Sequence, residues 1–161
     1  MKPLASINNG PIAAGLLLCT LFVIPSGCSV SETIPLRPAT ETVRFGDETK
    51  IDCSISIINR TKVFVHVDVL NQSTRPINID ASQSKLRIND SHEWTLALYR
   101  ADTNTAIIAA GQTNSLTLIP QGIEPSRQLR EDVLSGKPTL ELMVAGSDKK
   151  KQLLSFTKTI K

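Results

Sequence analysis

The sequence predicts an all-β domain, built as an antiparallel sandwich of about seven to nine strands. Apolar and polar residues alternate over residues 51–57 and again over residues 63–70, and the second segment places four valines on one face. A period of two residues is typical of half-buried strands. Only the polar residues 59–62 connect the two segments, so we expect an antiparallel hairpin.

Shorter segments of the same kind follow along the chain, and turns containing Asn, Asp, Ser or Gly separate them. This spacing is typical of a sandwich. One interval differs, because Leu129 and Val133 lie four residues apart and Gly136 follows them. We expect one short helical segment near residues 125–135, with an irregular crossover as the alternative. The remaining predicted strands are residues 76–80, 85–89, 94–100, 106–109, 115–119, 139–145 and 152–159.

The first 27 residues have the layout of a secretory leader. Lys2 is followed by a polar stretch and then by an apolar segment over residues 12–24. We expect this segment to form a signal helix that is too short to be a comfortable membrane span. The next four residues, Pro-Ser-Gly-Cys at 25–28, resemble the lipobox of bacterial lipoproteins. The resemblance implies cleavage between Gly27 and Cys28, and a stable lipid anchor of two or more acyl chains on Cys28.

The match to the lipobox has two departures. Pro25 occupies the position three residues before Cys28, at which the family favours Leu. Lys2 is the only basic residue ahead of the apolar segment. An ordinary signal peptide with Cys28 as a bystander is therefore the alternative. Ser29 differs from the Asp that marks inner-membrane retention in this family. The resemblance thus implies a lipid anchor on the cell membrane, and on the outer membrane facing the periplasm if the cell has two membranes.

These features divide the chain into three parts. Residues 1–27 are the expected lipoprotein signal peptide, residues 28–40 the lipidated Cys28 with a tether, and residues 41–161 the β-sandwich domain. The tether is expected because residues 29–40 contain two prolines and show no periodicity.

A second resemblance concerns residues 64–79. Alternating valines lead into Asn71-Gln72-Ser73, and a short strand begins at Pro76. The pattern is similar to that of exported immunoglobulin-like domains of bacterial lipoproteins, which implies an immunoglobulin-like sandwich. We expect the side chains of Asn71 and Ser73 to bond the backbone of their own turn.

Charge and motifs argue against several classes of function. Of the 18 Lys and Arg residues only Lys2 lies in the leader, which leaves 17 basic against 15 acidic side chains. Nucleic-acid affinity depends on clustered positive charge, so we expect no nucleic-acid partner. The sequence contains no nucleophile elbow, phosphate loop, His-Glu-x-x-His or Cys-x-x-Cys pattern. We therefore expect neither an enzyme nor a cofactor.

Three residues with reactive side chains remain. Cys53 alternates in register with Ile51 and Ile55, so we expect an inert buried thiol. His66 lies on the strand face opposite the valines, where a surface position is expected. His92, with Asp90 and Glu93, is a weak candidate for a metal site, because closed transition-metal sites need three or four convergent ligands.

The function expected from these observations is that of a non-enzymatic envelope lipoprotein. It would act as a protein-interaction, accessory or assembly module at the membrane surface, with an envelope protein as its partner. The alternative is a periplasmic module that binds a small ligand, a glycan or a metal through residues 90–93 and 102–104. An enzyme would require Ser, His and Asp to converge in space.

Overall fold

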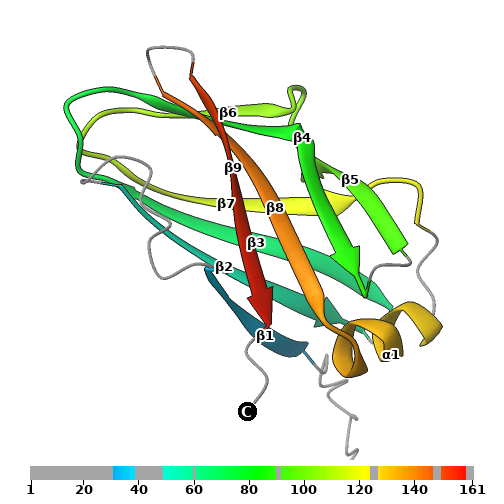
Figure 1. The fold of residues 1–161 in the computed structure, drawn as a ribbon. Coiled ribbons are helices and arrows are strands. Elements are labelled where there is room, and N and C mark those ends of the chain that lie inside the picture. Colours follow the sequence, from blue (N-terminus) through cyan, green and yellow to red (C-terminus); the bar gives the residue numbers. More distant parts are fainter. Residues whose placement is uncertain are drawn as a thin grey trace, which may run out of the picture.

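The computed structural model describes residues 31–38, 49–59, 61–89, 92–123, 127–146 and 150–158. The leader, its signal helix, Gly27 and Cys28 lie outside these ranges. Nine strands and one helix form in the described part of the chain (Figure 1). They are β1 Ser31–Pro38, β2 Thr49–Ile58, β3 Lys62–Asn71, β4 Ile77–Ile88, β5 His92–Leu98, β6 Thr105–Ile108, β7 Thr113–Pro120, α1 Arg127–Ser135, β8 Pro138–Ala145 and β9 Lys151–Lys158.

Eight of these strands close into a barrel. The order around it is β4, β5, β7, β3, β2, β1, β9, β8 and again β4. All pairs are antiparallel, and β6 is attached outside the ring to the first part of β4. The expected immunoglobulin-like sandwich is therefore wrong, although the all-β class, the 51–70 hairpin and the short helix are confirmed. Alternating strands satisfy a sandwich and a barrel equally well, because both bury one face of each strand.

β1 closes one seam of the barrel, and it occupies most of the expected tether. Residues 31–36 pair with β2, and residues 36–38 pair with β9. Ile34 and Leu36 are buried while Thr33 and Pro35 are exposed, which is the alternation of a half-buried strand. The tether prediction is thus wrong for Ser31–Pro38. Pairing with β9 begins only after Pro35, so this residue has a strand partner on one side alone.

β4 completes the ring by pairing with β5 and β8, and a bulge divides this strand into two parts. Residues 77–80 of this strand pair with β6 and residues 85–88 with β5, and the register against β8 shifts between Asp80 and Lys85. Asp80 Oδ1 accepts hydrogen bonds from Ser82 N at 3.1 Å and Ser82 Oγ at 2.6 Å. Ser84 Oγ donates to Asp80 O and accepts from Met143 N. Two predicted strands, 76–80 and 85–89, are therefore one bent strand.

Aliphatic side chains fill the interior of the barrel. The four valines of β3 point inward and are buried, as are Leu86 and Ile88 from β4 and Phe156 from β9. α1 covers one end, where Leu129 and Val133 are buried. Arg130 of this helix forms an ion pair with Glu32 of β1, and Lys158 Nζ donates to Leu134 O at 2.5 Å. The helix is thus fixed to both strands that meet at the β1 seam.

Asn71 links the end of β3 to β6 at the other end of the barrel. This side chain is fully buried. Its Nδ2 donates to the carbonyl oxygens of Arg75, Ile108 and Ala109 at 2.9 to 3.1 Å. Its Oδ1 accepts from Ser73 N at 3.2 Å and from Ser73 Oγ at 2.6 Å. The expected turn bonds are confirmed, and the contacts with Ile108 and Ala109 add a link that no local pattern indicated.

We expect Asn71→Ala to lower the free energy of unfolding by roughly 2–4 kcal/mol, because buried carbonyl groups lose a donor. Ser73→Ala, which removes only bonds of the turn, should cost roughly 0.5–1.5 kcal/mol. Urea unfolding of both variants measures the difference. Equal losses for the two variants would show that the link to β6 contributes nothing.

Candidate functional site

The structure tests only some of the residues singled out in the sequence. Gly27, Cys28 and Asp90 lie outside the described residues, so lipidation, cleavage and the full metal candidate stay predictions. His66 is half-buried on the outer face of β3, where its Nδ1 lies 3.4 Å from Thr117 Oγ1. Within the described ranges no three His, Cys, Asp or Glu side chains are placed to hold a metal ion.

Glu93 is held by cations on its own sheet surface. Its Oε1 lies 2.5 Å from Lys85 Nζ and its Oε2 lies 2.7 Å from Arg87 Nε. The hydrogen bonds from Lys85 and then Arg87 hold the pKa of this carboxyl below its usual range. The ring of His92 stacks on Trp94 with centroids 5.6 Å apart. These contacts fit a structured surface of the sheet, with the carboxylate already neutralised by its neighbours.

Cys53 lies in the core, as its register in β2 predicted. The residue is 5% exposed, and its partner across the ladder is Val67. Burial is the largest cause that raises the pKa of the thiol, and the charges of Asp52 and Asp68 raise it further. A nucleophile requires the thiolate. Cys53 is therefore a small core residue with no access to thiolate chemistry.

The raised pKa of Cys53 has a consequence for stability. The thiol stays protonated in the folded state and ionises above about pH 8.5 in the unfolded state. The protonated thiol makes its full contribution to the free energy of unfolding below that pH. As the pH rises further, this contribution falls by up to about 1.4 kcal/mol per pH unit. We expect Cys53→Ala to show a shallower loss of stability between pH 8.5 and 10 in urea unfolding. Parallel pH profiles for the two proteins would contradict this.

A slot in the barrel wall opens between β3 and β7. The two strands pair from Leu70 opposite Thr113 to Val65 opposite Leu118. The same register would place Ile119 opposite Phe64 and then Pro120 opposite Val63, but proline has no N–H to donate. Gln121 N donates to Thr95 O of β5, so the polar groups of Pro120 face the opposite side, toward β3. The ladder therefore ends there, and β7 continues beside β5 alone.

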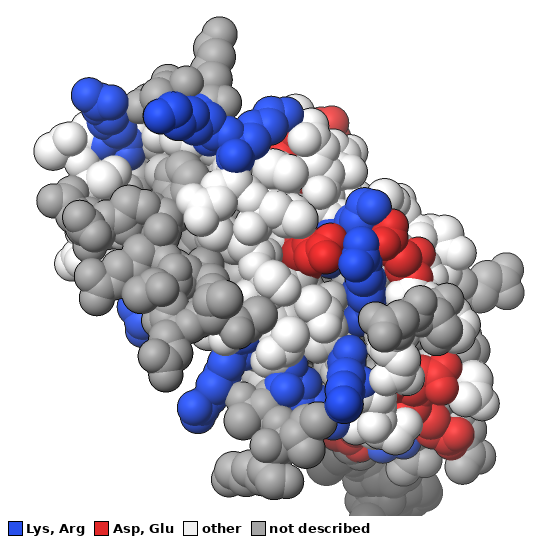
Figure 2. Space-filling view, in the orientation of Figure 1, with Lys and Arg blue, Asp and Glu red and all other residues white. Residues whose placement is uncertain are grey.

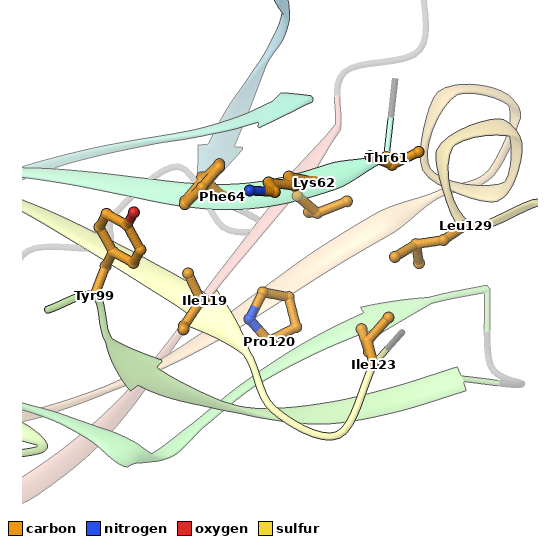
Figure 3. Close-up of a pocket in the computed structure, with 9 residues that line it drawn as sticks. Thr61, Lys62, Phe64, Tyr99, Ile119, Pro120, Ile123 and Leu129 are labelled. Atoms are coloured by element: carbon orange, nitrogen blue, oxygen red, sulfur yellow. The ribbon is translucent and has the colours of Figure 1, made fainter. Parts of the chain in front are cut away.

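The slot is an apolar cavity of about 250 Å³ at the end of the barrel covered by α1. Figure 3 shows Phe64 and Ile119 on opposite strands, with Ile123 and Leu129 at the end nearest the helix. Phe64 and Tyr99 form an edge-to-face pair with ring centroids 5.2 Å apart. They make a rigid aromatic wall at the outer mouth of the slot.

A second surface feature lies at the other end of the barrel. No strand in the described part of the chain pairs with the outer edge of β6. Ile107 of β6 is 68% exposed and Leu153 of β9 is 48% exposed. Met143 and Ala145 point outward from β8 because their neighbours Leu142 and Val144 are buried. The outward Asn78 and Asp80 of β4 lie between these two residues and β6. We call these four residues, Ile107, Met143, Ala145 and Leu153, the outer apolar face.

The strands β8 and β9 face the viewer in Figure 2, which shows uncharged surface together with Lys and Arg side chains and groups of Asp and Glu side chains. Sequence reasoning predicted neither the slot nor the outer apolar face. Two local signals pointed to them: a proline that ends the 113–120 strand, and consecutive isoleucines at 107 and 108, which cannot both face the core.

Comparisons of the chain with protein-family models, curated proteins and solved structures found no match. Among the described residues there is no helix long and apolar enough to cross a membrane.

Proposed function

We propose that this chain is a non-enzymatic lipoprotein of the cell envelope that binds another envelope protein. In this proposal the leader is cut between Gly27 and Cys28, and the lipid on Cys28 attaches the barrel to the membrane surface. In a cell with two membranes the barrel faces the periplasm from the outer membrane. The single observation that carries the proposal is the outer edge of β6, which pairs with no other described strand and exposes Ile107.

An exposed strand edge supports recognition of a protein partner. The edge offers backbone N–H and C=O groups to an added strand, and neighbouring side chains supply specificity. Each strand of the ring pairs along at least part of both sides, whereas β6 pairs on one side alone among the described strands. The outer apolar face adds Met143 and Leu153 as surface that a partner can cover.

The two ends of the barrel suit an anchored module. Cys28 precedes Ser31 by three residues, a span of at most about 11 Å. Ser31 pairs with Ile58, near the end that α1 covers. β6 pairs with the opposite end of β4, where Ile108 lies against Ile77. In Figure 1 β1 and α1 accordingly lie at the bottom and β6 at the top. An anchor on Cys28 would hold β6 away from the bilayer.

The anchor is tested with Cys28→Ala. We expect the wild-type chain to fractionate with membranes and to carry acyl mass on an N-terminal Cys28. The variant should lose the acyl mass and the processing that depends on it. Mass spectrometry of both proteins after membrane fractionation measures these changes. A wild-type chain without acyl mass would overturn the lipid anchor.

The partner surface is tested by photocrosslinking in intact cells. A photoreactive residue at position 107 should give a discrete crosslinked species, whereas the same residue at the exposed Thr95 of β5 should not. Asn78 of β4 is the cross-strand partner of Ile107. Asn78→Lys should therefore weaken the crosslink from position 107 without removing the probe. Equal yields at positions 107 and 95 would contradict the proposal.

A further inference from the structure

The slot between β3 and β7 has the shape of a site for a slim ligand. Pockets that enclose drug-sized ligands have volumes of roughly 300–1,000 Å³, and the slot holds about 250 Å³. It is open on the outside, where Phe64 and Tyr99 form its mouth. At its other end Leu129 of α1 is buried. A narrow chain could therefore enter with one end and leave its other end in solvent.

The chemistry of the lining selects an apolar chain. Phe64, Ile119, Pro120, Ile123 and Leu129 provide carbon surface, and no carboxylate is present among the described lining residues. Every buried polar side-chain atom in the described part of the chain already has a hydrogen-bond partner. A polar ligand would therefore find no buried, unpaired polar side chain in the described lining, and burial of apolar surface is the main source of affinity that the lining side chains offer.

Two cations lie at the mouth. Lys62 lines the slot, and its side chain points toward Phe64 in Figure 3. Within the described ranges Lys62 forms no ion pair. The guanidinium of Arg100 lies over the ring of Tyr99, with Cζ 4.9 Å from the centroid. An apolar interior with positive charge at its rim is complementary to an amphiphile that carries a negative head group.

We propose that the slot binds an acyl chain and that, where the amphiphile is a free fatty acid, its carboxylate lies at Lys62. This site is separate from the outer apolar face and goes beyond the proposed protein interaction. The acyl chain can have two sources, a free fatty acid or the lipid of this chain itself. The second source rests on the proposed anchor: Ser31, Ile58 and Lys62 lie in one row across three strands. Two strand spacings, roughly 10 Å, separate β1 from the rim.

A chain-length series tests the site on the full-length Cys28→Ala protein. Saturated fatty acids from octanoate to hexadecanoate are titrated below their micelle concentrations in competition with the fluorescent cis-parinaric acid. Each CH₂ that enters the slot should raise the affinity about fourfold. The increase should stop once the slot is filled. Absence of saturable binding, or of any dependence on chain length, overturns the proposal.

Two variants locate the binding. Ile123→Glu places a carboxylate inside the slot and should weaken fatty-acid binding at least tenfold, whereas the matched Ile107→Glu on β6 should leave it unchanged. Circular dichroism checks that both fold. Lys62→Glu should weaken fatty-acid binding roughly two- to fivefold and leave the corresponding fatty alcohol unaffected. Wild-type affinity in both Ile123→Glu and Lys62→Glu would place the probe elsewhere and overturn the assignment.

Comparison of the acylated wild-type protein with Cys28→Ala distinguishes the two sources. If the chain's own lipid fills the slot, the acylated protein should bind the probe at least tenfold more weakly than the variant. Equal affinity identifies a free amphiphile as the ligand. The acyl mass on Cys28 is measured in the same samples, so a failure of the anchor is seen separately from a failure of the slot to bind.

Discussion

The backbone pairing of β1 with β2 and β9 holds the barrel closed. Residues 31–36 bond to one neighbour and residues 36–38 to the other, so a single short strand joins the two ends of the sheet. α1 is fixed to the same seam, because Arg130 pairs with Glu32 and Lys158 donates to Leu134 O. Without β1 the edges of β2 and β9 would be unpaired, and the helix would lose one of its two supports.

Two interruptions of regular strand pairing produce the slot and the exposed edge of β6. At the bulge after Asp80 the partner of β4 changes, so that its first half pairs with β6 outside the ring, and no other described strand pairs with β6. Pro120 ends the ladder between β3 and β7 and opens the slot. Both are local departures within an otherwise continuous hydrogen-bonded wall. Bulges and prolines commonly mark such positions in sheets.

The reactive side chains singled out in the sequence are held by their neighbours, whereas two surfaces of the barrel expose apolar side chains. Burial keeps the Cys53 thiol protonated. Glu93 is bound by two cations, and His92 stacks on Trp94. By contrast, the slot combines carbon surface with Lys62 at its rim, and Ile107 is exposed on a strand that pairs on one side alone within the described ranges. The two surfaces lie at opposite ends of the barrel, so a ligand at one end and a partner at the other need not compete.

The sequence by itself determined the all-β class, the hairpin of β2 and β3 and the buried Cys53, and it offered a helix around Leu129 and Val133 with an irregular crossover as the alternative. These features depend on periodicity and neighbouring residues. Only the tertiary structure decided that the sheet closes into a barrel, because closure requires β1 to meet β9 across more than 110 intervening residues. For the same reason Asn71 could be assigned to its turn, but its bonds to Ile108 and Ala109 could not. The slot could not be predicted from the sequence either, because Pro120 indicates the end of a ladder only when its partner strand is known.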